Sequence, residues 1–151
     1  MHKAYYKSPI GILEIVANNK GITAISFVKI KSNNSKSNAL ITRCIVQLKE
    51  YFSGQRKTFD VPIVIEGTEW QVRVWTELTK IPFGSIIAYQ DLAAMSGNKQ
   101  AARAVGNAVN KNKIPIIIPC HRVLGSSGKL VGYEGGLWRK KYLLEQEIKY
   151  S

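Results

Sequence analysis

The residues best suited to chemistry lie together at Cys120, His121 and Arg122, directly after Pro119. A cysteine attacks as its thiolate, and a neighbouring imidazole or cation lowers the thiol pKa enough for that. The apolar run 116–118 predicts a buried strand that ends at the proline, where the ladder cannot continue. Neighbours on a strand face opposite sides, so a contact between Cys120 and His121 requires a turn or a bridging water. The alternative is a buried structural cysteine beside a core histidine.

Composition limits the kind of protein that carries this pair. The chain has 151 residues, of which 45% are hydrophobic, enough for one or two small domains. No stretch approaches the roughly 20 apolar residues of a membrane span, and the N-terminus lacks a secretion signal. We therefore expect a cytoplasmic protein with no membrane partner. Cys44 and Cys120 are far apart and form no Cys-x-x-Cys motif, so we expect reduced thiols and no metal.

The charge of the chain indicates its partner. The formal net charge is +12, from 22 basic and 10 acidic residues, which favours a polyanion such as nucleic acid. Solubility alone could account for part of this excess. The basic residues are spread over both halves of the chain, so the charge does not identify the half that binds.

The first half of the chain predicts strands with one helix. Apolar runs predict strands over 10–17 and 22–30 that form an antiparallel meander, and a further strand over 61–65. Apolar residues at helical spacing predict a helix over 40–52, and the polar tract 31–38 before it predicts a mobile loop. Residues 66–68 predict a boundary between an N-terminal structural domain, 1–66, and a second domain, 67–151.

The second half predicts the elements that position the cysteine. A capping-box pattern at 68–71 starts a helix that ends before Pro82. Helices predicted over 89–95 and 100–110, with a Ser-Gly turn between them, outline a helix-turn-helix. After the cysteine, a turn at 126–128 predicts a small hairpin between 123–124 and 130–131, and a helix over 137–147 closes the chain. This is an α+β fold, an α/β meander domain followed by a helical winged helix-turn-helix.

The helix predicted over 100–110 has one apolar and one smooth face. The apolar face comprises Ala101, Ala104, Val105, Ala108 and Val109, and the outer face comprises Ala102, Arg103, Gly106 and Asn110. Major-groove reading needs several long polar side chains, so sequence-specific regulation is disfavoured. A glycine within a helix costs about 1 kcal/mol, which suggests that another surface approaches Gly106 closely. A minor-groove approach fits, with Arg103 in the gap left by an extruded nucleotide; an ordinary solvated arginine is the alternative.

A glycine-rich loop at 132–136 follows the cysteine. Its missing side chains would allow a flat ligand to lie against the backbone. No Gly-Lys-Ser/Thr sequence follows, so the loop is not a nucleotide-binding Walker loop.

Three motifs together resemble those of the O6-alkylguanine-DNA alkyltransferases. They are Pro-Cys-His-Arg-Val at 119–123, Ala-Ala-Arg-Ala-Val-Gly at 101–106 and Gly-Gly-Leu at 135–137, and the resemblance covers the chain from about Trp70 to Glu147. It implies irreversible transfer of an alkyl group from O6 of guanine, less readily from O4 of thymine, onto Cys120. It also implies no cofactor, one lesion per molecule, a monomer, and double-stranded DNA containing alkylated bases as partner.

The resemblance assigns roles residue by residue. Cys120 is the nucleophile, His121 is its water-linked base, and Glu147 orients His121. Asn112 ties the turn after the recognition helix to the cysteine segment. Tyr89 helps to flip the nucleotide and protonates the leaving guanine.

The remaining expected site residues contact DNA or line the base pocket. Arg103 replaces the flipped base, and the other DNA-contacting residues are Ala102, Gly106, Tyr89 and Arg122. The base pocket comprises Val123, Tyr133, Glu134 and Gly135. Glu134 stands where the family usually has serine, which puts the acceptance of bulky alkyl groups in doubt.

Two other classes of protein use some of these features. A thiol hydrolase would employ the same cysteine, histidine and glutamate, but it needs an oxyanion hole and leaves the charge and the smooth helix unexplained. A winged-helix protein that only binds DNA explains the charge and the helix, but leaves the placement of Cys120 beside His121 as coincidence.

Overall fold

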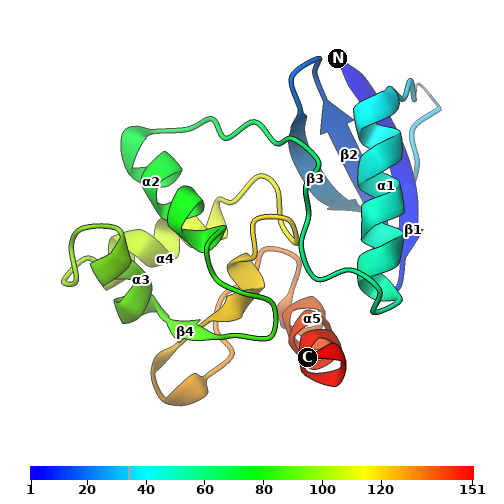
Figure 1. The fold of residues 1–151 in the computed structure, drawn as a ribbon. Helices are drawn as coiled ribbons and strands as arrows, with labels where there is room; N and C mark the ends of the chain where they lie inside the picture. Colours follow the sequence, from blue (N-terminus) through cyan, green and yellow to red (C-terminus); the bar gives the residue numbers. More distant parts are fainter. Residues whose placement is uncertain (34) are drawn as a thin grey trace. The chain divides into compact units, whose positions relative to one another are not determined.

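The computed structural model describes residues 1–33 and 35–151. The chain forms two compact units, Met1–Val64 and Ile65–Ser151 (Figure 1). Residue 34 belongs to the tract predicted as a mobile loop and lies outside the described residues.

The first unit is an antiparallel meander with one helix packed against it. Its strands lie in the order β1 (His2–Ser8), β2 (Gly11–Ala17) and β3 (Ile22–Val28). Alternate residues of β2, namely Leu13, Ile15 and Ala17, are fully buried, as expected for a strand with one face toward a core. The two predicted strands and their antiparallel pairing are confirmed.

Helix α1 (Ala39–Phe52) covers the sheet of this unit (Figure 1). The side chain of Asn38 caps the helix by accepting a hydrogen bond from the backbone N–H of Ile41 at 3.0 Å. Cys44 and Leu48 are fully buried on the face toward the core. The predicted helix is confirmed, and Cys44 is a core residue.

Two features of the first unit differ from the prediction. Strand β1 was not predicted, because neither of its faces is fully buried and its sequence shows no clear alternation. The strand predicted over 61–65 is wrong. The segment forms a single parallel bridge, between Ile22 and Ile63: the N–H of Ile22 donates to the carbonyl of Pro62 at 2.9 Å, and the N–H of Val64 donates to the carbonyl of Ile22 at 2.8 Å.

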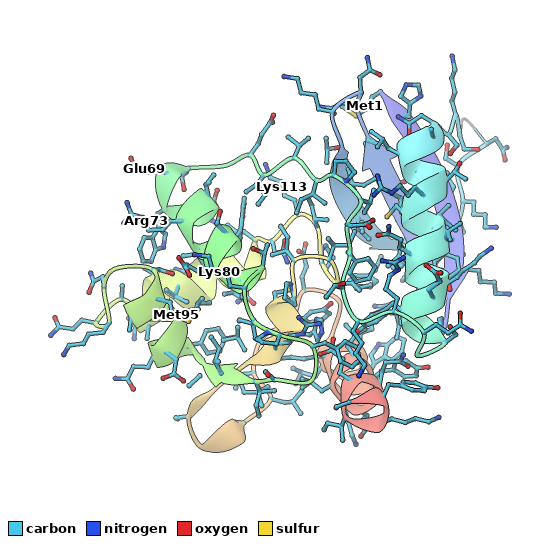
Figure 2. All side chains as sticks on the ribbon, viewed as in Figure 1. Met1, Glu69, Arg73, Lys80, Met95 and Lys113 are labelled. Carbon is cyan, nitrogen blue, oxygen red and sulfur yellow. The ribbon has the colours of Figure 1, made fainter. Side chains whose placement is uncertain are left out.

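The second unit contains the predicted helix-turn-helix. Its elements are α2 (Glu69–Leu78), β4 (Ile87–Ala88), α3 (Tyr89–Met95), α4 (Ala102–Asn110), η1 (Cys120–Arg122), β5 (Val123–Leu124), η2 (Ser126–Gly128) and α5 (Leu137–Tyr150). The predicted capping box is present, since Thr68 and Gln71 exchange side-chain-to-backbone hydrogen bonds of 3.1 Å. Glu69 and Arg73 form an exposed ion pair one turn apart on α2 (Figure 2).

Two tryptophans of α2 hold α4 in place. The indole N–H of Trp75 donates to the carbonyl of Ala108 at 2.8 Å, and that of Trp70 donates to the carbonyl of Ala104 at 3.2 Å. Val105, Ala108 and Val109 are buried, as predicted for the apolar face of α4, but Ala104 is exposed. The buried stripe is therefore narrower than predicted, because only these three side chains pack inward.

The three isoleucines before the cysteine form a turn, so the predicted strand is wrong. The N–H of Ile118 donates to the carbonyl of Ile114 at 2.9 Å, which closes the turn, and Ile116 has a positive φ of 75°. Ile114, Ile116 and Ile118 are nonetheless buried. An apolar run of this length has the same composition whether a strand or a compact turn buries it.

The hairpin predicted after the cysteine is also wrong. β5 pairs in parallel with β4, through Ile87 with Val123 and Ala88 with Leu124. The segment after β5 closes on itself instead, since the N–H of Gly125 donates to the carbonyl of Lys129 at 2.8 Å. The pair of short strands brings the start of α3 beside the cysteine segment, which the predicted hairpin would not do.

Helix α5 completes the second unit and extends three residues beyond the predicted end. Its buried residues are Lys140, Leu143, Gln146 and Glu147. Among the described residues, no helix is both long and apolar enough to cross a membrane.

Candidate active site

Cys120 opens the 3-10 turn η1 and is almost completely buried, with 6% of its surface exposed. Burial raises the pKa of its thiol to about 11, although a hydrogen bond from Asn112 and the charge of Lys140 oppose this. The cysteine is therefore a protonated thiol at neutral pH. The sequence predicted a lowered pKa for this thiol, but burial raises the pKa by more than the charge of Lys140 lowers it.

Asn112 braces the turn that leads to the cysteine. Its side-chain oxygen accepts from the N–H of Ile114 at 2.9 Å, and its side-chain nitrogen donates to the carbonyl of Ile118 at 2.8 Å. All three residues are buried. The asparagine thus fixes both ends of the turn while its side chain also contacts the thiol of Cys120.

His121 and Glu147 form a buried pair. Nε2 of His121 lies 2.6 Å from Oε2 of Glu147, and the two side chains are 0% and 1% exposed. Burial alone would raise the pKa of Glu147, but the hydrogen bonds and charges of His121 and Arg122 hold it well below its usual range. An ionised carboxylate only accepts, so Nε2 of His121 carries the hydrogen and Nδ1 carries the lone pair. Nδ1 is buried and has no hydrogen-bond partner among the described residues.

Arg122 is directed into the unit. Its guanidinium donates to both oxygens of Glu147, from Nε at 2.8 Å and from Nη2 at 2.9 Å, and its Nη1 donates to the carbonyl of Ile81 at 2.6 Å. Only 7% of the side chain is exposed. These three hydrogen bonds direct the guanidinium into the unit, and the contact of Arg122 with DNA stays a prediction.

Lys140 lies on the same side of α5 as Glu147 and is fully buried. Its Nζ donates to the carbonyls of Val131 and Gly132 at 2.8 and 3.3 Å and lies 5.9 Å from the centre of the Tyr89 ring. Burial lowers the pKa of Lys140 to about 8, and the negative charge that Cys120 can carry opposes this. The ammonium and the thiol therefore influence each other directly.

Tyr89 and the loop after β5 face the same thiol. Burial, and then the charge of Cys120, raise the pKa of Tyr89 and raise that of Tyr133 well above its usual value. The hydroxyl of Tyr89 donates to the carbonyl of Val131 at 3.4 Å. Glu134 is exposed, yet its charge still reaches Cys120 and raises the thiol pKa.

The other predicted pocket residues lie on either side of this loop. Val123 is fully buried at the start of β5. Gly135 is buried, and its carbonyl accepts a hydrogen bond from Nη1 of Arg139 at 2.6 Å. The structure thus places Tyr89, Tyr133 and Glu134 around the thiol of Cys120.

The predicted DNA-contacting residues on α4 lie on its outer face. Arg103 is exposed, and Ala102 and Gly106 are partly exposed. A side-chain carbon added at Gly106 would meet the ring of Tyr89 at 3.9 Å, which is an ordinary contact. Packing within the unit therefore does not require a glycine at this position.

Comparison with known proteins agrees with these features. Residues 69–149 match the model of the 6-O-methylguanine DNA methyltransferase DNA binding domain, and residues 1–65 match that of its ribonuclease-like domain. The chain belongs to the 6-O-methylguanine DNA methyltransferase family. The resemblance predicted from the motifs is thereby confirmed.

Individual members of the 6-O-methylguanine DNA methyltransferase family align over almost the whole chain. A Methanosarcina acetivorans protein named methylated-DNA--protein-cysteine methyltransferase is 40% identical, covering 97% of this chain and 98% of its own. A Mycobacterium bovis protein of the same name is also 40% identical, covering 97% of this chain and 92% of its own. The crystal structure of Mycobacterium tuberculosis OGT in complex with DNA has a TM-score of 0.91 and 39% identity, covering 100% of this chain and 95% of its own.

Sequence reasoning missed two groups at the site of this 6-O-methylguanine DNA methyltransferase family member. Lys140 precedes Leu143 by three residues and Glu147 by seven, so helical spacing alone places it on their buried face. The backbone N–H of Gly84 donates to Oε1 of Glu147 at 3.0 Å. No pattern in the sequence indicates this second contact, because it joins groups 63 positions apart.

Among the described residues, no group of three or more His, Cys, Asp and Glu side chains is placed to hold a metal ion. The groups that the site brings together are the thiol, the imidazole, the carboxylate, the buried ammonium and two phenols.

Proposed function

We propose that this protein repairs DNA by moving an alkyl group from O6 of guanine, less readily from O4 of thymine, onto Sγ of Cys120. The bond between the alkyl carbon and the base oxygen breaks, a carbon–sulfur bond forms, and the base leaves with a proton. The thioether is stable, so each molecule acts once and needs no cofactor. The observation that carries the proposal is the buried Cys120 followed directly in the chain by His121, whose Nε2 lies 2.6 Å from the buried carboxylate of Glu147.

His121 acts as the base that removes the thiol proton. Burial lowers the pKa of His121, so its imidazole is neutral at pH 7 and its Nδ1 lone pair is available. A water between Nδ1 and Sγ would pass the proton, and Glu147 would stabilise the imidazolium that forms. The buried Lys140 ammonium then stabilises the thiolate until it attacks.

Tyr89 supplies the proton that the departing guanine needs. A raised pKa keeps its phenol protonated at neutral pH, and the phenol faces the thiol. The flat base would lie between Val123 and the loop 133–135, where the missing side chain of Gly135 leaves room for it. Asn112 holds the cysteine segment in position throughout.

Helix α4 enters the minor groove of the duplex. The small outer face around Ala102 and Gly106 allows a close approach to the DNA backbone, and Arg103 fills the gap left by the extruded nucleotide. The duplex that contains an alkylated base is thus the substrate. We further propose that the protein acts as a monomer in the cytoplasm, with residues 1–66 as a structural domain and residues 67–151 as the domain that binds DNA and accepts the alkyl group.

Mass spectrometry of the intact protein tests this function. After incubation with duplex DNA carrying O6-methylguanine, the protein should gain one methyl group, on Cys120, and the gain should stop there. Cys120→Ser should still bind the duplex but gain nothing. Cys44→Ala is the matched control, because Cys44 is a buried core thiol of the other unit, and it should gain one methyl group.

The same experiment separates the two other classes of protein. A thiol hydrolase would turn over an acyl substrate repeatedly and leave the methylated duplex unchanged. A protein that only binds DNA would retain the duplex without any gain of mass. Either result would contradict alkyl transfer.

A further inference from the structure

The carboxylate of Glu147 has more partners than a histidine–glutamate pair requires. Oε1 accepts from Nε of Arg122 at 2.8 Å and from the backbone N–H of Gly84 at 3.0 Å. Oε2 accepts from Nε2 of His121 at 2.6 Å and from Nη2 of Arg122 at 2.9 Å. A carboxylate offers about four acceptor positions, so all of them are occupied.

The arginine is itself held rigidly. Its Nη1 donates to the carbonyl of Ile81 at 2.6 Å, and its guanidinium carbon lies 5.8 Å from the centre of the Phe83 ring. Ile81, Phe83 and Gly84 belong to one loop between α2 and β4, so this loop supports both ends of the ion pair. Gly84 has a positive φ of 79°, which favours glycine; a Cβ there would lie 2.9 Å from Oγ of Ser151, a side chain that can move aside.

Three charged groups act on His121. Glu147 and Lys140 face it from α5, and Arg122 adjoins it in η1. Without Arg122, the negative charge of Glu147 would act on the imidazole with no neighbouring arginine to offset it. With Arg122 in a two-point contact, that charge is partly offset, because the charge of Arg122 lowers the pKa of His121 while that of Glu147 raises it.

We infer that Arg122 is a positioning residue for alkyl transfer, and this rests on the function proposed above. Together with Gly84 it fixes the Glu147 carboxylate so that His121 carries its hydrogen on Nε2 and stays neutral, with the Nδ1 lone pair free to accept the thiol proton. An uncompensated Glu147 would instead hold His121 as an imidazolium, which has no lone pair to accept a proton. Arg122 therefore acts on the general base, His121, through Glu147, and not on the thiol.

Two variants separate the charge of Arg122 from its bulk. Arg122→Gln keeps a hydrogen-bond donor near Glu147 but removes the charge. Arg122→Lys keeps the charge but cannot bridge both oxygens. The matched control is Arg56→Gln in the other unit, because Arg56 also donates from Nε to a carboxylate, Glu50, at 2.9 Å and from Nη1 to a backbone carbonyl at 2.9 Å.

The readout is the pH dependence of the single-turnover rate of methyl transfer. The rate should fall at low pH as His121 becomes protonated. In Arg122→Gln this fall should move to higher pH by about one to three units, the usual effect of one close charge. Arg122→Lys should restore most of the original profile, and Arg56→Gln should leave the profile unchanged. A folded Arg122→Gln variant with the original profile would overturn the inference.

Nitrogen NMR of the imidazole rings tests the same point without DNA or transfer. The chain has two histidines, so His2 serves as the internal reference. In the unaltered protein, His121 should be neutral at pH 7 with its hydrogen on Nε2; an imidazolium, or hydrogen on Nδ1, would overturn the inference even if Arg122→Gln fails to fold. If His121 is neutral in the unaltered protein and becomes protonated at higher pH in Arg122→Gln, but no methyl group is transferred, the proposed function fails and the role of Arg122 in setting the state of His121 stands.

Discussion

The side chain of Asn112 donates to the backbone carbonyl of Ile118 at 2.8 Å, two residues before the nucleophile. The same side chain accepts from the N–H of Ile114 at 2.9 Å, so one buried amide fixes both ends of a turn. The turn contains Ile116 in a left-handed conformation, which is unfavourable for a β-branched residue and needs support from its surroundings. The position of Cys120 thus depends on a residue eight places earlier in the chain.

We expect Asn112→Ala to destabilise the protein by about 2–4 kcal/mol, since it removes two hydrogen bonds and leaves buried backbone groups unpaired. It should also slow methyl transfer, because Cys120 would no longer be held in place. Urea unfolding and single-turnover transfer measure the two effects. Asn107→Ala is the control, because Asn107 is exposed on α4 and its loss should change stability by less than about 0.5 kcal/mol. Equal effects of the two variants on stability would contradict the role of Asn112.

The sequence predicted most of the second unit because its signals are local. The capping box of α2, the Ser-Gly turn and the apolar stripe of α4 each fix an element without reference to distant residues. The predicted helix-turn-helix and the α+β class are confirmed for this reason. In the first unit, strand β1 was missed because both of its faces are only half-buried.

The errors arise where the local sequence does not determine which groups pair with one another. The run 116–118 is apolar in a strand or in a turn, and only the bond from Ile118 to Ile114 decides between them. Likewise, β5 is short enough that its partner, β4, cannot be identified from its own residues. The burial of Arg122 is not visible in sequence either, since it depends on Glu147 and on the loop that contains Ile81.

Lys140 should control how easily Cys120 loses its proton. Lys140→Met removes the positive charge that lowers the thiol pKa, so alkylation of Cys120 by iodoacetamide should require a pH about one unit higher or more. Lys141→Met is the control, because the Lys141 side chain is 67% exposed. The reaction rate of Cys120 across pH, followed by peptide mass spectrometry, measures the shift. An unchanged profile in Lys140→Met would show that the ammonium does not act on the thiol.

Lys140 should also leave a signature in stability against pH. Burial lowers its pKa from 10.5 to about 8, so between these pH values the unfolded chain binds more protons than the folded protein. The contribution of Lys140 to the free energy of unfolding therefore rises with pH over this window. The difference in stability between the unaltered protein and Lys140→Met should rise accordingly from pH 8 to 10.5. A flat difference would contradict a buried, charged Lys140.

Arg103 should matter for duplex DNA and not for the chemistry at the thiol. Arg103→Ala removes the exposed side chain proposed to fill the gap in the base stack, so transfer from a duplex should slow by tenfold or more, the effect of roughly 1.4 kcal/mol. Reaction with the free base O6-methylguanine should change little, since no base is extruded. The control is Arg73→Ala on α2, whose side chain is 51% exposed and pairs with Glu69. Equal losses with duplex and free base in Arg103→Ala would count against base extrusion.

Gly106→Ala should have opposite effects on stability and on DNA repair. Alanine is favoured over glycine within a helix by about 1 kcal/mol, and the added carbon meets only an ordinary contact with Tyr89, so the melting temperature should rise. The added methyl group stands on the face proposed to approach the DNA backbone, so affinity for the duplex should fall. Ala104→Gly, at an exposed position of the same helix, should lower the melting temperature. A Gly106→Ala variant that bound the duplex as tightly as the unaltered protein would exclude a close approach of DNA at this point.

Glu134 should restrain the reactivity of the thiol. Its exposed carboxylate raises the pKa of Cys120, so Glu134→Gln should lower that pKa and make the thiol react faster at neutral pH. Because Glu134 is exposed, salt should screen the effect, and the two proteins should converge as ionic strength rises. The control is Glu145→Gln on α5, whose side chain is 64% exposed and pairs with Lys141. The rate of Cys120 alkylation by iodoacetamide at low and high salt separates an effect of charge from an effect of shape. If Glu134→Gln still reacts faster at 1 M salt, Glu134 acts by its shape in the pocket and not by its charge.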